Sequence, residues 1–363
     1  MKRRPRRPRR RRLHATAVVA ALLASVACND STDRNSYDVP RAPIALHGVG
    51  ATASKALFAR WAEQYALVDP STTLVYEAAG SGAGVKAALE DTADFGVSDS
   101  PLSDADAAAH GDVMHLPVAV EGIALVYTLA GLPPTRLQAT EDLAADMLSG
   151  RVAWWDDPAI LALNAGVKLP HVAIRPVYRA DQSGSSYLVS QWLAKTSRKW
   201  HDPATRSLTL PTGTGAQKED GVLARLSGTD GSLGYVSAVA ALAAHLPTFA
   251  VRNAAGRFAT PSLEGLRAAA ATANLGGDLR ADAVAAPGDL AYPICSFTFV
   301  LLRATSKGNE VARRAVGHFF WWATHDGQAF APPLGFAALP GELQVRGEGV
   351  LHALRGADGE PLL

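Results

Sequence analysis

Strand-like and helix-like segments alternate along the chain from Ile44 onward, and no other feature of the sequence constrains the fold as much. Short apolar runs alternate with segments whose apolar residues recur at helical spacing, as in the segment 53–65. The predicted order is a strand over 43–47, a helix over 53–65, a strand over 73–77, a helix over 85–90 and a strand over 94–98. Alternation at this pace predicts an α/β fold with mixed, mostly parallel sheets.

The second half of the chain continues this alternation, with a predicted strand over 172–178, a helix over 186–195 and a strand over 234–237. Two further strand-like runs, 122–127 and 293–302, could each cross between the two series of elements. Two crossings predict two lobes with a cleft between them, which is the plan of a hinged binding protein. We predict that lobe I comprises residues 43–127 plus 293–363 and that lobe II comprises residues 128–292.

The N-terminal 42 residues have the pattern of an export signal. Nine of the 35 Lys and Arg residues lie in positions 2–12, and no Asp or Glu precedes Asp30. The apolar segment 13–27 follows, which is typical of a secretory signal peptide and is too short for a comfortable membrane span. We predict a signal peptide over 1–27 and a polar tether over 28–42. The Arg pairs leave a twin-arginine export route open.

Cys28 stands where a bacterial lipoprotein carries its lipidated cysteine. Val26 and Ala27 fit the lipoprotein motif, whereas Ser25 occupies a position at which Leu is usual. We predict lipidation of Cys28, so that the protein contacts the membrane only through this anchor. Ordinary cleavage near this point and a disulfide to Cys295 are the alternatives, although the strand-like run around Cys295 is typical of a buried thiol.

The charge of the mature chain differs from that of the whole sequence, which is +1. Removal of residues 1–27 leaves 26 Lys and Arg against 34 Asp and Glu, a formal net charge of −8. An acidic chain argues against a nucleic-acid partner bound through general basicity. A basic arm for nucleic acid is also the less favoured interpretation of residues 2–12, because the apolar run and the cleavage-site residues follow at once.

Four loops combine small or hydroxyl residues with a helix start, and together they predict an anion site. The loops are 48–52, 80–82, 98–99 and 179–185. A helix N-terminus offers unpaired backbone N–H groups and a partial positive charge. Each loop alone is typical of an ordinary turn or N-cap. The four together supply hydroxyl donors, N–H groups, the guanidinium of Arg179 and the carboxylate of Asp99.

A carboxylate beside an anion site is unusual, because like charges repel. Asp99 makes sense there if the bound anion carries a proton that the carboxylate accepts in a hydrogen bond. Among common oxyanions at neutral pH, phosphate carries such a proton and sulfate does not. Sulfate would leave Asp99 facing a second anion with no proton between them, so the residues favour phosphate.

These segments resemble the PstS-like periplasmic phosphate-binding proteins, the receptors of ABC phosphate transporters. The matching segments follow the family order and include Gly50-Ala-Thr52, Gly80-Ser-Gly-Ala-Gly-Val-Lys86, Asp94-Phe-Gly-Val-Ser-Asp99, Arg179-Ala-Asp181, Ser183-Gly-Ser185, Gly234-Tyr-Val236 and Phe297-Thr-Phe299. The resemblance implies a two-lobed periplasmic-binding-protein fold of type II, with hinge strands and the ligand cleft between the lobes.

The resemblance also implies site residues. The implied phosphate-binding residues are Thr52, Ala53, Ser81, Asp99, Arg179, Ser183, Gly184 and Ser185. Asp99 would accept a phosphate O–H, and Arg179 would donate to phosphate while Asp181 orients it. Two positions depart from the family: Ala53 stands where Phe is often found, and Ser185 stands where Thr is frequent. The smaller side chain of Ala53 predicts a binding pocket that is less covered, whereas Ser185 keeps the hydroxyl group that Thr would supply.

The expected function is therefore high-specificity binding of inorganic phosphate in the periplasm or cell envelope. The resemblance implies that a monomer delivers phosphate to the membrane permease and ATPase of an ABC importer, with no catalysis and no cofactor or metal.

Three alternatives remain. A binding protein for sulfate, molybdate or tungstate would have the same architecture, but Asp99 argues against it. A phosphatase or other hydrolase would need an activated serine, and Ser81 lacks the Gly two residues before it that a nucleophile elbow requires. A surface-interaction module could use the aromatic run 319–322, which in a helical pattern is more typical of a core.

Overall fold

The computed structural model describes residues 42–132, 136–305 and 309–363. The predicted signal peptide over 1–27, the tether over 28–42 apart from Ala42, and the lipidation site Cys28 lie outside the described residues. The chain from Pro43 to Leu363 forms one compact unit.

Among the described residues, eight strands form one mixed sheet in the order β2-β1-β3-β11-β4-β8-β6-β7. The pairs at both ends of this order are parallel, and the pairs β3–β11, β11–β4 and β4–β8 in the middle are antiparallel. The strands are β1 (Ile44–Gly50), β2 (Thr72–Ala78), β3 (Phe95–Ser98), β4 (Val113–Thr128), β6 (Arg175–Arg179), β7 (Thr214–Ala216), β8 (Ser232–Ser237) and β11 (Cys295–Arg303). The short strands β5 (Gln138–Ala139), β9 (Ala250–Arg252) and β10 (Phe258–Ala259) form a second sheet.

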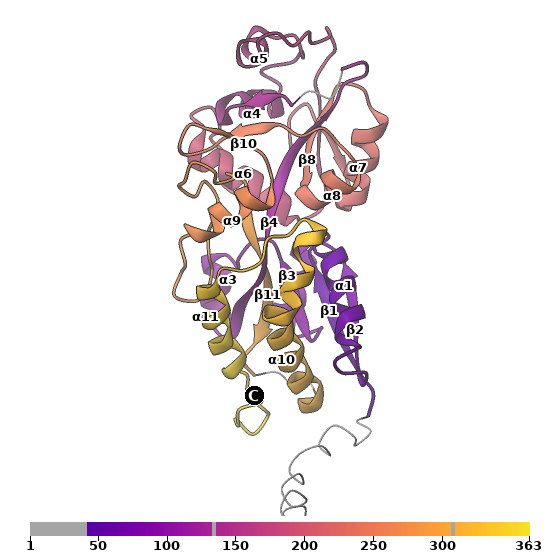
Figure 1. The fold of residues 1–363 in the computed structure, drawn as a ribbon, viewed down its shortest axis with the longest axis vertical. Helices are drawn as coiled ribbons and strands as arrows, with labels where there is room; N and C mark the ends of the chain where they lie inside the picture. The colour runs from indigo at the N-terminus through magenta and orange to yellow at the C-terminus, as the bar shows by residue number, and fades with distance from the viewer. Residues whose placement is uncertain (1–41, 133–135, 306–308) are drawn as a thin grey trace, which may run out of the picture. The chain divides into compact units, whose positions relative to one another are not determined.

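β4 connects the two parallel parts of the large sheet. Its first part, Val113 to Gly122, pairs with β11 around a bulge at Val118, and its last six residues, Ile123 to Thr128, pair with β8. Figure 1 shows β4 running from the group of elements that contains β1–β3 to the group that contains β8. β4 is nearly buried throughout, as expected of a strand covered on both faces. The sequence predicted the crossing only over 122–127, because the charged residue Glu121 precedes that segment.

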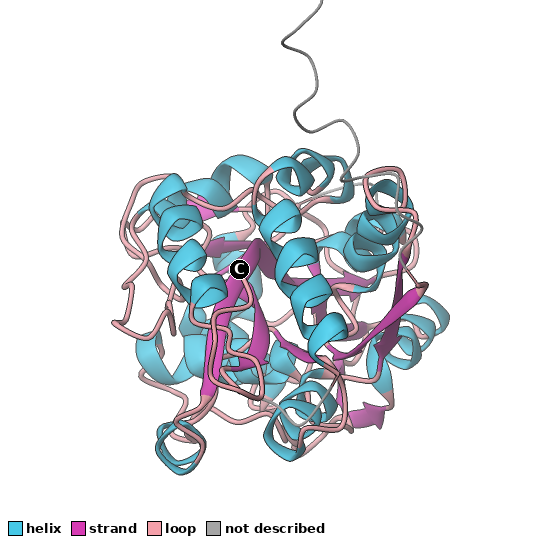
Figure 2. Cartoon of the chain, turned by 90° about the horizontal axis from the view of Figure 1, so that it is seen from below, coloured by secondary structure: helices cyan, strands magenta, loops and turns pink. Residues whose placement is uncertain are grey.

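Helices cover the strands on both sides, as the view in Figure 2 shows. We name the elements around β1–β3 lobe I and those around β6–β8 lobe II. In lobe I, α1 (Lys55–Tyr65) and α10 (Glu310–Thr324) pack their aromatic side chains, among them Phe58 and Phe320, into one core with Phe95 of β3. The opposite face of β3 meets α2 (Ser81–Glu90), where a Cβ on Gly96 would lie 2.2 Å from the carbonyl oxygen of Gly84. The glycine pair therefore lets α2 approach the strand closely, and this sets the position of the helix start at Ser81.

The remaining helices complete both lobes. Trp155 and Trp192 are fully buried in the core of lobe II, and the aromatic run 319–322 contributes Phe319, Phe320 and Trp322 to the core of lobe I. Burial of these three residues supports the core interpretation for them, whereas Trp321 is exposed. The other helices are α3 (Asp104–Ala109), α4 (Glu141–Leu148), α5 (Pro158–Leu163), α6 (Gly184–Thr196), α7 (Lys218–Gly228), α8 (Ala238–Ala243), α9 (Leu263–Ala271) and α11 (Gly341–His352).

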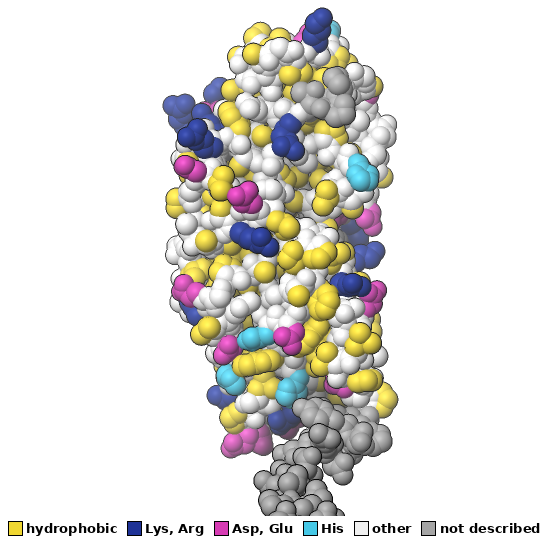
Figure 3. Space-filling model, in the orientation of Figure 1, with side chains coloured by type: hydrophobic (Ala, Val, Ile, Leu, Met, Phe, Trp, Pro, Cys, Tyr) yellow, Lys and Arg dark blue, Asp and Glu magenta, His cyan; other side chains and the backbone are white. Residues whose placement is uncertain are grey.

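Cys295 is a fully buried free thiol in β11, and burial raises its pKa above the ordinary range of a cysteine. On the face seen in Figure 3, Lys and Arg side chains are interspersed with Asp and Glu. Among the helices of the described residues, none has the length and apolar character that crossing a membrane requires.

Candidate anion-binding site

The four loops singled out in the sequence follow strands of the large sheet. Thr52 and Ala53 lie between β1 and α1, Ser81 begins α2 just after β2, and Asp99 directly follows β3. Arg179 is the last residue of β6, and Ser183 is the N-cap of α6. The carboxyl ends of strands are where α/β sheets bind ligands, because helix N-termini gather there.

Asp99 and Ser81 meet in the buried part of this site. The Ser81 hydroxyl donates to Oδ2 of Asp99 at 3.2 Å, and its oxygen lies 3.3 Å from the Asp99 backbone nitrogen. Only 2% of Asp99 and 1% of Ser81 is exposed. Oδ1 of Asp99 is buried and has no hydrogen-bond partner among the described residues. The carboxylate therefore has unused acceptor capacity in a place from which water is largely excluded.

Arg179 brings a buried positive charge to the same place and is held by Asp181. Nε of Arg179 donates to Oδ1 of Asp181 at 2.8 Å, and Nη2 donates to Oδ2 at 2.5 Å. Burial alone would lower the pKa of Arg179, but its hydrogen bond and ion pair with Asp181 raise that pKa above the ordinary value. The backbone N–H of Lys218 also donates to Asp181, at 2.9 Å. Asp181 thus fixes the plane of the guanidinium.

The outer nitrogen of that guanidinium reaches across to lobe I. Nη1 of Arg179 lies 3.3 Å from the hydroxyl oxygen of Thr52, to which it donates. The backbone N–H of Gly82 likewise donates to the carbonyl of Gln182 at 3.3 Å. The loops of the two lobes are therefore in direct contact around the site.

The start of α6 closes the site from the side of lobe II. Ser183 caps the helix, and its hydroxyl accepts from the backbone N–H of Ser186 at 3.4 Å. Gly184 lies so close to lobe I that a Cβ at this position would be 2.6 Å from Cβ of Asp99 and 2.7 Å from Oγ of Ser81. Ser185 follows as a buried residue of the first helical turn, and Ala53 is buried on the opposite lobe. The structure thus gathers the predicted residues of both lobes around Asp99 and Arg179.

Burial raises the pKa of the Asp99 carboxyl from its ordinary value to about 6. The charge of Glu219 raises it further, whereas hydrogen bonds with Glu121 and Ser81 and the charge of Arg179 act in the opposite direction. The carboxyl is thus ionised at neutral pH but prefers a partner that brings a proton or a positive charge.

Sequence reasoning missed several residues around the site, Glu121 above all. Glu121 is 1% exposed, lies on β4 and is close enough to Asp99 to influence the pKa of its carboxyl. A charged residue inside the apolar run 116–127 was the available signal. Arg206 was also missed: it donates to Oγ of Ser100 at 2.9 Å and so links lobe II to the segment after Asp99. No sequence pattern marks Arg206, which stands in a loop.

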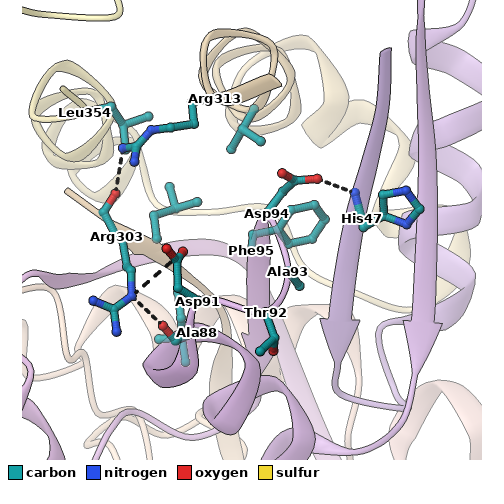
Figure 4. Close-up of a pocket in the computed structure, with 13 residues that line it drawn as sticks. His47, Ala88, Asp91, Thr92, Ala93, Asp94, Phe95, Arg303, Arg313 and Leu354 are labelled. Carbon is teal, nitrogen blue, oxygen red and sulfur yellow. Dashed lines mark hydrogen bonds and ion pairs between the residues drawn. The ribbon is translucent and has the colours of Figure 1, made fainter. Parts of the chain in front are cut away.

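A separate cavity of about 400 Å³ lies at the other end of β3, as Figure 4 shows. Its charged groups have partners within the protein. Asp94 accepts from the backbone N–H of His47 at 2.7 Å, Arg303 donates to the carbonyl of Ala88 at 3.0 Å, and Nη2 of Arg313 donates to two backbone carbonyls. None of the predicted site residues lines this cavity. Among the described residues, no cluster of His, Cys, Asp and Glu has the arrangement of a metal site.

Comparisons with known proteins place this chain in a family. Residues 34–326 match the model of the PBP superfamily domain. The chain is 32% identical over 321 residues to a phosphate-binding protein PstS of Xylella fastidiosa (strain 9a5c), covering 86% of this chain and 87% of the relative. It is 32% identical over 302 residues to the phosphate-binding protein PstS of Pasteurella multocida (strain Pm70), and the match covers 82% of this chain and 87% of the relative.

The fold is similar to that of a high-affinity periplasmic phosphate-binding protein, PfluDING, solved with bound phosphate. The TM-score is 0.66 at 19% identity, and the match covers 88% of this chain and 100% of the solved chain. This likeness confirms the predicted two-domain periplasmic-binding-protein architecture. On the strength of the family model and of relatives matched over most of their length, the chain belongs to the PBP superfamily and, within it, to the PstS family of phosphate-binding proteins.

Proposed function

We propose that this protein binds inorganic phosphate with high specificity and delivers it to an ABC phosphate importer. The observation that carries this proposal is the buried carboxylate of Asp99, which stands beside the hydroxyl of Ser81 and the start of α6. Such a carboxylate disfavours an anion without a proton and favours one that donates an O–H. The names of the curated PstS relatives agree with this ligand.

Within this proposal, the residues of both lobes divide the work of binding. Thr52, Ser81 and the N–H groups at Ala53, Gly184 and Ser185 would donate to phosphate oxygens, together with the hydroxyl of Ser183. Arg179, oriented by Asp181, would supply the positive charge, and Asp99 would accept the phosphate proton. Donors held in place before the ligand arrives lose little freedom on binding, which favours tight association.

Lobe I would comprise residues 43–127 plus 293–363, and lobe II residues 128–292, as the sequence predicts. The two strands that pass between them, β4 and β11, would then act as the hinge. We expect a monomer, because a closed pair of lobes presents a single joint surface to a permease and its ATPase. A binding role without catalysis fits a site whose serines have no basic partner in the observed hydrogen bonds of the described residues.

Equilibrium dialysis with labelled phosphate tests the proposal. Unlabelled phosphate should displace the label at stoichiometric concentration, and sulfate, molybdate and tungstate should fail to do so even in large excess. Displacement by one of the other oxyanions at comparable concentration would reassign the site to that anion. Release of phosphate from a phosphomonoester by the purified protein would instead support a hydrolase.

A further inference from the structure

Two buried carboxyl groups meet beneath the proposed phosphate site. Glu121 is 1% exposed and Asp99 is 2% exposed. Both side-chain oxygens of Glu121 and Oδ1 of Asp99 have no donor among the other described residues. A buried carboxylate without a donor costs several kcal/mol, and two such charges side by side cost more. The pair therefore requires a proton between its oxygens.

The strand register explains how the two groups come together. Glu121 of β4 pairs with Ser296 of β11, and the hydroxyl of Ser296 donates to the backbone carbonyl of Asp99 at 2.9 Å. Thr298 lies two residues further along β11 and so on the same face, and its buried hydroxyl oxygen also lacks a partner among the described residues. The antiparallel centre of the sheet thus brings Glu121 close to Asp99 through their shared neighbour Ser296.

The groups that surround the pair leave Glu121 as the protonated member. Burial first, and then the charge of Asp99 and the hydrogen bond between the two carboxyls, raise the pKa of Glu121 well above its ordinary range. Glu219 of α7 adds negative charge to both, while Arg179 of β6 lowers the pKa of Asp99. The other titratable neighbours, Tyr76 of β2 and Cys295 of β11, stay neutral because burial and the carboxylates raise their pKa values.

We propose that Glu121 is protonated and donates a hydrogen bond to Oδ1 of Asp99. Asp99 thereby stays ionised, and its Oδ2 remains able to accept the phosphate O–H. This inference rests on the proposed function and identifies Glu121 as a positioning residue for it. A protonated Glu121 removes one negative charge from the neighbourhood of the ligand. It also keeps Asp99 from taking up a proton of its own, which would turn it into a donor able to bind sulfate.

The expected consequence is a pH dependence of phosphate affinity that belongs to the protein rather than to the ligand. At alkaline pH the ligand-free pair loses its proton, so phosphate must bind together with a proton and the affinity falls. Glu121→Gln keeps an N–H donor toward Asp99 but cannot ionise. Because phosphate titrates identically in both experiments, the difference between wild type and Glu121→Gln isolates the contribution of the carboxyl pair.

The test is isothermal titration of wild type and Glu121→Gln with phosphate, from acidic to alkaline pH and in two buffers of different ionisation enthalpy. We expect similar affinities at acidic pH. At alkaline pH, the affinity of wild type should fall relative to that of Glu121→Gln by up to about tenfold for each pH unit above the titration of the pair, the limit for uptake of one proton. It should also take up a proton that the variant does not. Superimposed profiles and equal proton uptake would overturn the inference.

Two further variants separate the hydrogen bond from the charge. Glu219→Gln removes another buried carboxylate, which accepts from the backbone N–H of Ser237 at 2.7 Å, and it should keep the proton uptake of wild type. Glu121→Ala removes the donor, so Asp99 should protonate more readily and sulfate binding should rise near neutral pH. Unchanged sulfate rejection in Glu121→Ala would count against the inference.

A measurement on the wild-type protein keeps the inference testable if the variants do not fold. Infrared difference spectra at neutral pH should contain the carbonyl stretch of a protonated carboxylic acid that shifts when phosphate binds. Absence of that band would overturn the role of Glu121. Failure of wild type to bind phosphate at any pH would instead overturn the proposed function itself.

Discussion

Asp99 and Arg179 are the two buried charged residues on which the proposed site depends, and they are coupled to different neighbours. Arg179 is held by Asp181 from its own loop, whereas Asp99 is held by Ser81 and Glu121 from other elements. The direct partner of Arg179 is two residues away in sequence. The partner of Asp99 on β4 is brought close only by the sheet.

Replacement of Arg179 by Lys should weaken phosphate binding by about a hundredfold, or about 2–3 kcal/mol, because an ammonium cannot keep two bonds to Asp181 and still face the ligand. Isothermal titration measures the loss. Arg252→Lys, a partly exposed arginine that pairs with Glu141, is the matched control and should bind phosphate as wild type does. Wild-type affinity in Arg179→Lys would show that Arg179 does not contact phosphate.

The raised pKa values of Asp99 and Glu121 predict how stability depends on pH. In the unfolded chain both carboxyls titrate near pH ~4, whereas burial raises the pKa of folded Asp99 to about 6 and that of Glu121 above its ordinary range. The folded protein therefore binds these protons more tightly. The stability that these two protons contribute is complete at pH values below the pKa of the carboxyls in the unfolded chain. It is lost as the pH rises through the pKa of the carboxyls in the folded protein.

Urea unfolding of ligand-free protein in phosphate-free buffers checks this direction. Glu121→Gln should gain stability relative to wild type as pH rises from about 5 to about 8, by up to about 1.4 kcal/mol per pH unit for the one group. Wild-type and variant stabilities that change in parallel with pH would contradict the assignment of a raised pKa to Glu121.

Much of the site's charged chemistry was predictable from the sequence, and Glu121 shows where prediction stopped. Asp99 and Asp181 stand in loops that follow strands, and Arg179 is the last residue of a strand, so the place of all three at strand ends follows from local pattern. Glu121 was missed because the sequence pattern began the crossing strand at Gly122. Its importance depends on neighbours in β3 and β11, which only the pairing of strands supplies.

Helix starts are the elements that build the site. α2 and α6 face each other across it, and glycine permits both close approaches: Gly84 of α2 packs against β3, and Gly184 of α6 packs against Asp99 and Ser81. The helix over 85–90 was predicted too short, since the helix begins at Ser81. Small residues such as Gly82 and Gly84 weaken the helical pattern in sequence while allowing the packing that stabilises the helix in the fold.

Gly184→Ala should therefore hinder closure of the two lobes. The new methyl group would lie 2.6 Å from Cβ of Asp99 and 2.7 Å from Oγ of Ser81, and the first of these is not a flexible chain end. We expect phosphate affinity to fall by at least about tenfold while the ligand-free protein keeps its melting temperature.

The matched control is Gly349→Ala in α11, where a Cβ meets nothing within 4 Å among the described residues. This variant should keep wild-type affinity and gain about 0.5–1 kcal/mol of stability, because alanine favours the helix. Titration calorimetry and thermal unfolding separate the two effects. If Gly184→Ala bound phosphate with wild-type affinity, the close contact of Gly184 with Asp99 and Ser81 would not be part of the phosphate-bound state.

At the scale of the whole molecule, β4 and β11 form the antiparallel centre that joins the two parallel parts of the large sheet. This topology brings both series of strand ends to a common place, so residues as distant as Thr52 and Arg179 touch. The sequence predicted two crossing strands and thus the two-domain plan. It could not show the antiparallel pairing of these strands or the full length of β4, because both depend on contacts between segments far apart in the chain.

The proposed lipid anchor belongs to the same scale, because it decides where the receptor works. Cys28→Ala should move the protein from the membrane fraction to the soluble fraction of cells, since a diacylated cysteine supplies the hydrophobic attachment. Phosphate affinity of the purified variant should stay unchanged. Wild type that fractionates as a soluble protein, or a variant that stays in the membrane fraction, would contradict lipidation at Cys28.

The most direct measurement of the central claim is isothermal titration of the mature protein, freed of bound phosphate, with phosphate and with sulfate at equal ionic strength. We predict tight one-to-one binding of phosphate and no heat from sulfate in wild type, and in Asp99→Asn a relative gain for sulfate of at least about tenfold. Comparable binding of both anions by wild type, or binding of neither, would contradict the assignment of a phosphate site whose specificity depends on the Asp99 carboxylate.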